Sequence, residues 1–332
     1  MNSSTKQILI AFLSLWINCC FAQSELHLVN IGDFRTTEGK IIENCKIGYR
    51  TIGKLNNDKK NVVLLTTPFT FKSAGLIGLT SLFVDTTGIY IIIVDALTNG
   101  VSSSPSNTPD FPIISIRDMV NSQYDLLVNH LNIDHLYAVM GLSMGGMQTF
   151  EWMVAYPEFM DKAIPIIGTP KQSFYDVLLW QTQADLIIEA GSNEHNVDFA
   201  MKRAYDILNM NTSTPSYLNR TVSPDSINAF RKKYGKMMNS KDYLAGLNAM
   251  IKHDIYKSSN SNLDNIKNVV KADVLVVISQ QDHAVNPTSS IVFSKTFGCV
   301  LLELTSDCGH MTLGCGESEK VKEAISSFLK RK

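Results

Sequence analysis

Short, almost uninterrupted runs of apolar residues recur along the chain and constrain its fold most strongly. A strand with one face in water alternates apolar and polar residues, whereas a continuous apolar run suits a strand covered on both faces, as in a parallel sheet. The runs are Asn61–Thr66, Tyr90–Val94, Leu136–Met140, Lys162–Ile167, Val274–Ile278 and Val300–Leu304. Amphipathic helical patterns such as Ile116–Leu131 and Glu317–Lys330 lie between several of them. This alternation predicts an α/β fold with a mostly parallel central sheet flanked by helices.

One long segment, residues 171–263, departs from this rhythm. It has helical periodicity, many Met, Tyr and Asn residues and no pattern of a buried strand. Loop-like spacers at Asn211–Ser216 and Ser258–Asn262 punctuate it. We interpret the segment as a helical lid inserted into a core that is formed by residues 23–170 and 264–332.

The N-terminus has the pattern of a secretory signal. Lys6 gives a weakly basic start, Ile8–Ile17 is apolar, and the small residue Ala22 suits a cleavage site. The apolar run is about half as long as a hydrocarbon core requires. We therefore expect removal of residues 1–22 and a secreted or periplasmic protein without a stable membrane anchor. A buried N-terminal strand or helix and lipid attachment at a cysteine of this segment are the alternatives.

The composition limits the partners of the chain. Its 332 residues are 18% charged with a formal net charge of −1, and Lys and Arg are scattered. This balance gives neither the basic footprint of nucleic-acid binding nor a polybasic membrane patch. The cysteines outside the signal lack the C-x-x-C spacing of zinc sites. We therefore expect a small-molecule substrate, no nucleic-acid partner, no metal and no cofactor.

The pentapeptide Gly141–Gly145 (GLSMG) fits the pattern G-x-S-x-G. It follows a predicted strand directly and precedes the helical run Gly146–Tyr156. In this context small residues let the chain turn sharply from strand to helix, so the hydroxyl of Ser143 projects above the sheet edge and the helix N-terminus faces it. Ser143 is therefore the predicted nucleophile.

A serine hydroxyl needs a general base within hydrogen-bond reach and a third group that holds this base. His310 lies in the loop after the last apolar run, and Asp282 lies just past the run before it. The order along the chain is then Ser, Asp, His. Asp307 is the alternative acid, but it is only three residues from His310 and would reach the far ring nitrogen with difficulty. We predict acyl transfer through a Ser143–His310–Asp282 triad.

Acyl transfer passes through a tetrahedral oxyanion that needs two hydrogen-bond donors. The first expected donor is the N–H of Met144, the residue after the nucleophile, and the second comes from the loop after an early strand. In that loop, Thr66–Thr70, Pro68 has no N–H, which points to Phe69. A purely structural loop is the alternative for Phe69.

Cys308 and Cys315 flank the predicted catalytic histidine at a separation of seven residues. In an oxidising compartment the two thiols can form a disulfide, which would hold the histidine loop. Two unpaired thiols packed against the sheet are the alternative, and Cys299 is an equally available partner. The sequence leaves both open.

Three longer stretches stand out, Ile47–Asn56, Phe111–Val120 and Gly141–Trp152 (GLSMGGMQTFEW). They resemble an early Tyr-x-Thr-x-Gly-x-Leu-Asn segment, a helix entry and the nucleophile elbow of the homoserine O-acetyltransferase family of α/β hydrolases. The likeness runs from about Leu26 to the C-terminus apart from the insertion. It implies the α/β-hydrolase fold and transfer of an acyl group from a thioester to a hydroxyl, with Ser143 acylated first. It also implies helices over the active site that pair two subunits.

Several positions depart from this family pattern. Thr67–Phe71 takes the place of the sequence His-Ala-Leu-Thr-Gly of the acyltransferases. Val101–Pro105 takes the place of their Gly-Ser-Thr-Gly-Pro. Met311 follows the predicted catalytic histidine at the position where the acyltransferases have Asp. No Arg occurs between Arg117 and Arg203 to bind the homoserine carboxylate. We therefore predict that homoserine is not the preferred acceptor.

These observations favour an exported ester hydrolase, in which water takes the place of the acceptor alcohol. An O-acyltransferase that moves an acyl group from a thioester to a hydroxyl is the first alternative, because the two reactions share every step through the acyl-enzyme. A catalytically inactive binding protein on the same scaffold is the second alternative, and its mark would be a broken triad.

Overall fold

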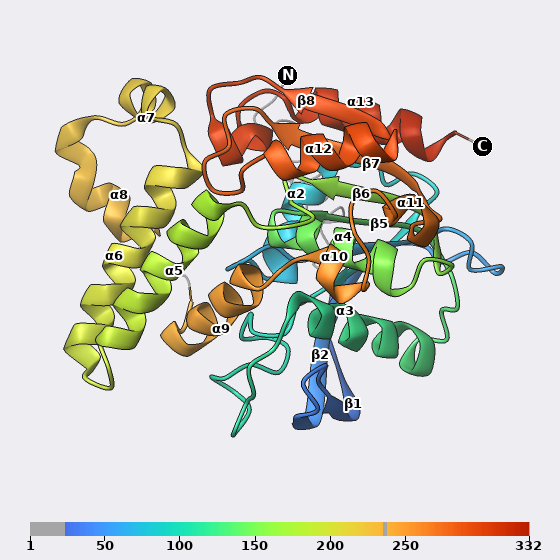
Figure 1. Ribbon diagram of the computed structural model, residues 1–332, viewed down its shortest axis with the longest axis horizontal. Coiled ribbons are helices and arrows are strands. Elements are labelled where there is room, and N and C mark those ends of the chain that lie inside the picture. Colours follow the sequence, from blue (N-terminus) through green and yellow to red (C-terminus); the bar gives the residue numbers. More distant parts are fainter. Residues whose placement is uncertain (1–23, 235–237, 332) are drawn as a thin grey trace, which may run out of the picture.

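The predicted apolar runs form adjacent strands of one eight-stranded sheet, in the order β1-β2-β4-β3-β5-β6-β7-β8 (Figure 1). The computed structural model describes residues 24–234 and 238–331, and the predicted signal segment, residues 1–22, lies outside the described residues. The strands are β1 (His27–Arg35), β2 (Ile41–Gly53), β3 (Val62–Thr66), β4 (Tyr90–Val94), β5 (Leu136–Leu142), β6 (Met160–Ile166), β7 (Asp273–Ser279) and β8 (Val300–Leu304). Strands β3 to β8 are parallel, so the predicted fold class is confirmed.

The first two strands were not among the predicted runs. β1 pairs antiparallel with β2, and β2 pairs antiparallel with β4. In β2 the buried residues Ile42, Cys45 and Ile47 alternate with exposed ones, and register shifts interrupt the pairing with β1. A strand with one solvent-exposed face has no continuous apolar run. The pattern that located the parallel strands therefore does not identify this hairpin.

Helices cover both faces of the sheet. Val63 and Leu65 of β3 belong to the apolar layer with α2 and α13, whereas Leu64 belongs to the opposite layer with α3, α4 and α12. This division follows from the two-residue repeat of a strand. The elements of the two layers and their connections are α2 (Ser73–Phe83), α3 (Ile116–Asp125), the π-helical turn η1 (Leu126–His130), α4 (Met144–Ala155), α12 (Thr288–Phe297), the 3₁₀ turn η3 (Gly309–Gly314) and α13 (Ser318–Leu329).

The connection from β6 to β7 is long and helical. It contains α5 (Phe174–Glu189), α6 (Glu194–Thr212), α7 (Pro215–Thr221), η2 (Pro224–Ser226), α8 (Ile227–Tyr234), α9 (Ser240–Ile251), α10 (Ile255–Ser258) and α11 (Ile266–Val269). Figure 1 shows α5 to α8 standing beside the sheet. Helices α5 to α10 lie in the segment predicted to be helical, and its role as a lid domain stays a prediction. In the described part of the chain no helix, α6 included, is long and apolar enough to cross a membrane.

Candidate active site

Ser143 lies in the sharp turn between β5 and α4. Its backbone has φ 57° and ψ −120°, a region that side-chain-bearing residues rarely adopt. The flanking glycines are required by close contacts: a Cβ on Gly141 would lie 2.2 Å from Thr66 Oγ1, and one on Gly145 would lie 2.5 Å from Thr66 O. The pentapeptide therefore forms the strained strand-to-helix elbow that its sequence predicts.

The imidazole of His310 lies between the predicted nucleophile and the predicted acid. Its Nε2 is 2.9 Å from Ser143 Oγ, and its Nδ1 is 2.6 Å from Asp282 Oδ2. These residues follow β5, β7 and β8, whose carboxyl ends meet at one edge of the sheet. The structure thus brings the three predicted residues into one continuous chain of hydrogen bonds.

Asp282 is held rigidly by its own loop. Its Oδ1 accepts hydrogen bonds from the backbone N–H groups of Ala284 (2.8 Å) and Val285 (2.9 Å), which leaves Oδ2 for His310. Only 1% of the Asp282 side chain is exposed, against 11% of the His310 side chain. A buried carboxylate with both oxygens bonded has one orientation, so it fixes the plane of the imidazole.

The alternative acid, Asp307, pairs with Arg220 of α7. Arg220 Nη2 lies 2.9 Å from Asp307 Oδ1, and Nη1 donates to the other carboxylate oxygen. Hydrogen bonding to this guanidinium lowers the pKa of Asp307. Thr214 Oγ1 also donates to the carbonyl of Asp307. Asp307 therefore attaches the histidine loop to the inserted helices and does not orient His310.

A disulfide joins Cys308 to Cys315, with Cα atoms 6.3 Å apart. The bond closes the short turn η3, which carries His310, and Cys299 is a free cysteine. Of the two alternatives that the sequence leaves open, the structure has the disulfide. It restrains the backbone on both sides of the histidine.

The inserted helices also support the loop that carries Asp282. Asp176, in the first turn of α5, accepts hydrogen bonds from the N–H of Asn286 (2.9 Å) and from the N–H of Ser173 (2.8 Å). Burial raises the pKa of Asp176, and the negative charge of Asp282 acts in the same direction. Helix α5 therefore contacts the acid loop and α7 contacts the histidine loop.

The two predicted oxyanion donors lie on segments that contact each other. Met144 begins α4, and the first N–H groups of a helix have no partner within the helix. The loop after β3 lies against this turn, because Thr66 Oγ1 donates to the carbonyl of Gly145 over 2.8 Å. The ring of Phe69 is buried against Trp180 and Tyr243 of the inserted helices. The donor roles of Met144 and Phe69 stay predictions.

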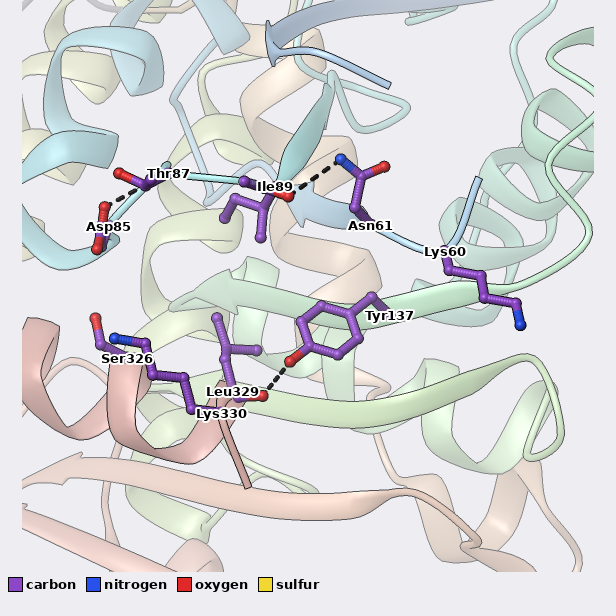
Figure 2. A pocket seen from close by; sticks show the side chains of 10 residues that line it. Lys60, Asn61, Asp85, Thr87, Ile89, Tyr137, Ser326, Leu329 and Lys330 are labelled. Atoms are coloured by element: carbon purple, nitrogen blue, oxygen red, sulfur yellow. Dashed lines mark hydrogen bonds between the residues drawn. The ribbon is translucent and has the colours of Figure 1, made fainter. Parts of the chain in front are cut away.

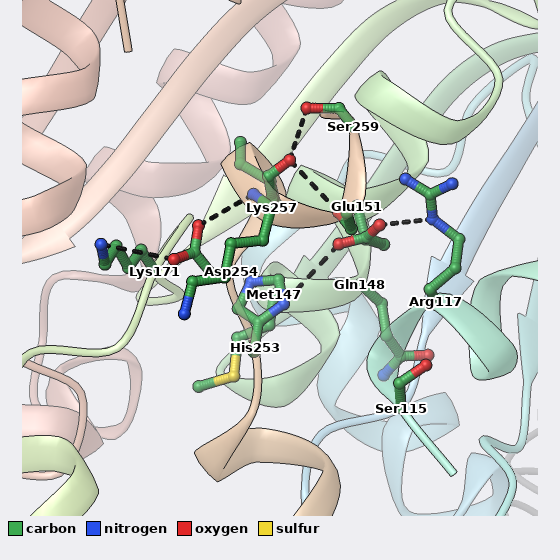
Figure 3. A network of polar contacts seen from close by, with 12 residues as sticks. Ser115, Arg117, Met147, Gln148, Glu151, Lys171, His253, Asp254, Lys257 and Ser259 are labelled. Carbon is green, nitrogen blue, oxygen red and sulfur yellow. Dashed lines mark hydrogen bonds and ion pairs between the residues drawn. The ribbon is translucent and has the colours of Figure 1, made fainter. Parts of the chain in front are cut away.

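Farther along α4 lies a second buried polar network that the sequence analysis missed (Figure 3). Arg117 of α3 pairs with Glu151, and His253 Nδ1 is 3.8 Å from the other oxygen of Glu151. His253 Nε2 is 2.9 Å from the carbonyl of Thr169. Burial lowers the pKa of His253. In the sequence, the one feature that could have indicated this network is the single Glu in the apolar run of α4. The network joins α3 and α4 to the segment after α9.

Two cavities are lined by residues other than Ser143, Asp282 and His310. A cavity of about 270 Å³, lined by Asn61, Ile89 and Tyr137, opens at the amino-terminal ends of β3, β4 and β5 (Figure 2). Ligands of open α/β sheets bind at the opposite, carboxyl ends. A larger cleft of about 1110 Å³ lies among α5, α6, α9 and the loop after β4, with Tyr205 and Asp242 in its lining. The hydrogen-bonded residues therefore define the site better than these cavities do.

Comparison with known proteins agrees with this fold. A model of the family described as alpha/beta hydrolase fold matches residues 81–314. The chain is 37% identical over 173 residues to a probable esterase of Corynebacterium glutamicum, covering 48% of this chain and 49% of the relative. It is 36% identical to the ethyl acetate hydrolase of Pseudomonas veronii, covering 49% and 48%. It is 35% identical to the homoserine O-acetyltransferase of Methanococcoides burtonii, covering 43% and 34%.

The matches span at most about half the length of these relatives, whereas solved structures match almost throughout. An acetylester hydrolase from Corynebacterium glutamicum has a TM-score of 0.86 at 23% identity, covering 93% of this chain and 97% of that one. The homoserine O-acetyltransferase from Bacillus anthracis has a TM-score of 0.77 at 20% identity, covering 93% and 98%. The resemblance seen in the sequence is confirmed, and the chain belongs to the alpha/beta hydrolase fold family of enzymes.

Proposed function

We propose that this chain is a serine esterase with Ser143 as nucleophile. The observation that carries the proposal is the unbroken chain of hydrogen bonds from Ser143 Oγ through His310 to Asp282. A catalytically inactive binding protein with this fold would not need to keep all three side chains hydrogen-bonded to one another. The intact arrangement therefore supports catalysis over the inactive alternative.

The geometry allows a two-step acyl transfer. His310 Nε2 removes the proton of Ser143 Oγ as this oxygen attacks the acyl carbonyl, and the N–H groups of Met144 and Phe69 bind the resulting oxyanion. The intermediate collapses to an acyl-enzyme while His310 gives the proton to the departing alcohol. A water molecule, deprotonated by His310, then attacks the acyl group. The bond from the acyl carbon to Ser143 Oγ breaks, His310 returns the proton to Ser143 Oγ, and the acid departs. Asp282 stabilises the imidazolium in both steps.

The uncharged side chains packed around Phe69 favour an uncharged ester as the substrate. Near the predicted oxyanion loop, the hydroxyl of Tyr243 donates to Gln183 Oε1 over 2.6 Å, and the ring of Phe69 packs between Tyr243 and Trp180. Gln183 lies on α5, within the stretch between Arg117 and Arg203 that contains no arginine to bind a substrate carboxylate. An amide already paired with a phenol does not replace a bidentate cation. The names of two relatives, an esterase and an ethyl acetate hydrolase, point the same way.

An O-acyltransferase is the second candidate, and the similarity to homoserine O-acetyltransferases favours it. The two candidates differ only in whether water or an alcohol attacks the acyl-enzyme. Incubation with acetyl-CoA and homoserine, with products identified by mass, separates them. We expect acetate and no substantial O-acetylhomoserine. Efficient acetyl transfer to homoserine would make the chain an acyltransferase.

We also propose export, with residues 1–22 removed as a signal. The disulfide between Cys308 and Cys315 supports this, since such bonds persist in oxidising compartments. Mass analysis of the protein from the culture medium or periplasm should find Gln23 as the first residue. A cytoplasmic protein that retains Met1 would contradict the proposal.

Pairing of two subunits through the inserted helices is a further proposal. Phe174 and Leu178 of α5 and Phe199 and Met210 of α6 are exposed apolar side chains, which supports an apolar contact surface. Light scattering of the purified protein should give twice the mass of one chain. A monomer at micromolar concentration would contradict it.

The test of the nucleophile is covalent labelling. A fluorophosphonate should modify Ser143 and abolish hydrolysis of short-chain p-nitrophenyl esters, and Ser143→Ala should take up no label at that peptide. Turnover by Ser143→Ala should fall by about 10⁴-fold or more. A label on another serine, or unchanged turnover in the variant, would refute the proposal.

The test of the acid compares two aspartates on neighbouring loops. Asp282→Asn should lower kcat by about 10⁴-fold, because the amide favours the wrong tautomer of His310. Asp307→Asn is the matched control: it loses the pairing with Arg220 and should keep kcat within about tenfold. The reverse order of effects would show that the acid is misassigned.

A further inference from the structure

Gln148 is a fully buried amide in the second turn of α4, and it touches both predicted oxyanion segments. Its Nε2 donates to the carbonyl of Met144 over 3.2 Å and to the carbonyl of Thr67 over 3.0 Å. Thr67 N–H donates to the carbonyl of Val94, and Pro68 has no N–H. Phe69 therefore supplies the next N–H of this loop.

A buried relay fixes which way the amide of Gln148 points. The indole Nε1 of Trp152 can only donate, and it lies 2.8 Å from Gln123 Oε1. Gln123 must then present its Nε2 to Gln148 Oε1, at 2.6 Å. This leaves the Nε2 of Gln148 for the two carbonyls. All three side chains are at most 1% exposed, so no water competes for these bonds.

We propose that Gln148 is a positioning residue that sets the spacing of the two oxyanion donors, held in its orientation by Gln123 and Trp152. The inference rests on the proposed function, because it assumes that Met144 and Phe69 bind the oxyanion. Gln148 Nε2 bridges the carbonyl of Thr67, two residues before Phe69, to the carbonyl of Met144. Loss of this amide lets the loop after β3 shift relative to α4 without removing a group that touches the substrate.

Other contacts keep this loop folded when Gln148 is changed. Ala96 N–H donates to Thr67 Oγ1 over 2.9 Å. At the far end of the loop, the N–H and hydroxyl of Ser73 donate to the carboxylate of Asp95 over 2.7 and 2.6 Å. Substitution of Gln148 should therefore change the spacing of the donors and leave the fold intact.

The experiment measures ester hydrolysis and inhibition by a trifluoromethyl ketone, which forms a tetrahedral oxyanion on the serine. Gln148→Met should lower kcat by about 10- to 100-fold with KM changed less than about threefold, because a small misplacement of donors acts on the transition state. Affinity for the ketone should fall by the same factor as kcat/KM. A merely structural role would not produce this proportionality.

Gln172→Met is the matched control. Gln172 is also a buried amide, and its Nε2 donates to the carbonyl of Met250 over 2.9 Å, away from the loop after β3. This variant should lose melting temperature to a similar degree and keep kcat and ketone affinity within about twofold. Gln123→Leu, which leaves Gln148 without its orienting partner, should show a smaller loss with the same proportionality, and it decides the matter if Gln148→Met does not fold.

Two outcomes overturn the inference. Equal kinetic effects in Gln148→Met and Gln172→Met would make Gln148 a packing residue only. A fall in kcat without a matching fall in ketone affinity would separate Gln148 from the oxyanion. Ser143→Ala, measured alongside, identifies the other failure: if it still hydrolyses the ester, the proposed function is wrong whatever Gln148 does.

Discussion

Two histidines of this protein each lie near a buried carboxylate, yet their surroundings differ. His310 Nδ1 is 2.6 Å from Asp282, and its Nε2 is 2.9 Å from the hydroxyl of Ser143. His253 Nδ1 is 3.8 Å from Glu151, and its Nε2 is 2.9 Å from the carbonyl of Thr169. The His310 side chain is 11% exposed and the His253 side chain 1%.

The partner of the second ring nitrogen distinguishes the proposed catalytic histidine from the structural one. A carbonyl only accepts, so His253 carries its proton on Nε2. A serine hydroxyl can donate, so the bond from Ser143 needs a lone pair on His310 Nε2 and a proton on Nδ1, which Asp282 holds. The two imidazoles therefore have opposite tautomers. A carboxylate neighbour alone does not identify a general base; what the far nitrogen faces does.

The largest expected difference between the two histidines is in turnover. His310→Gln should reduce kcat for a p-nitrophenyl ester by about 10⁴- to 10⁶-fold, because the proposed general base is lost. His253→Gln should keep kcat within about fivefold and lower the free energy of unfolding by about 1 to 3 kcal/mol, the usual cost of disturbing a buried hydrogen-bonded group. Steady-state kinetics and urea unfolding of both variants check these values.

A fall in kcat of His253→Gln beyond about 100-fold, with a native melting temperature, would break the distinction. The buried network at Glu151 would then be coupled to the nucleophile through α4. Equal stability of wild type and His253→Gln would instead show that the hydrogen bond to Thr169 contributes little.

The same contrast explains what the sequence alone could predict. Ser143, Asp282 and His310 each follow a continuous apolar run, and such runs mark buried parallel strands whose carboxyl ends meet. The predicted strands therefore implied that these three residues lie close together at one edge of the sheet. His253 follows a helix of the insertion, and nothing near it in the sequence marks Glu151 as its neighbour.

Contacts between the insertion and the core were also beyond sequence reasoning. Arg220 and Asp307 are 87 residues apart, and their pairing depends on how α7 rests on the histidine loop. Gln148 lay inside the elbow stretch GLSMGGMQTFEW, but a polar residue on a helix is commonly exposed. Only the neighbouring Thr67, Gln123 and Trp152 show that it is buried and what it holds.

A smaller effect is expected from the covalent restraint that His310 has and His253 lacks. Cys308→Ser or Cys315→Ser should lower the free energy of unfolding by about 2 to 3 kcal/mol, because the unfolded chain regains the freedom of a short loop. The value of kcat should fall by less than about tenfold, since Asp282 and the contacts of Asp307 still hold the histidine loop. Thermal unfolding with and without reductant measures the first effect.

Cys299→Ser is the control for these variants, because Cys299 is a half-buried free thiol outside the disulfide. It should behave like wild type in kcat and should remain sensitive to reductant. Equal melting temperatures of wild type and Cys308→Ser under oxidising conditions would show that the disulfide adds nothing to stability.

The smallest expected effect is the pH dependence that His253 gives to stability. Burial lowers the pKa of this histidine from its usual value of 6.5, against the opposing influence of Glu151, the carbonyl of Thr169 and Asp254. Above pH 6.5 the histidine is neutral in both the folded and the unfolded chain, and its ionisation does not affect stability. As the pH falls below 6.5 the unfolded chain binds a proton that the folded chain resists, so stability is lost until the folded pKa is reached.

Melting temperatures of wild type and His253→Gln between pH 8 and pH 5 test this dependence. The advantage of wild type over the variant should be greatest above pH 6.5 and should shrink as the solution becomes more acidic, because only the wild type has the buried imidazole. All other ionisable groups are present in both proteins, so most of their contribution cancels in the difference. An advantage that stays constant or grows below pH 6.5 would mean that the folded protein accepts the proton at His253. Glu151 would then stabilise an imidazolium there, and the two histidines would be more alike than their surroundings indicate.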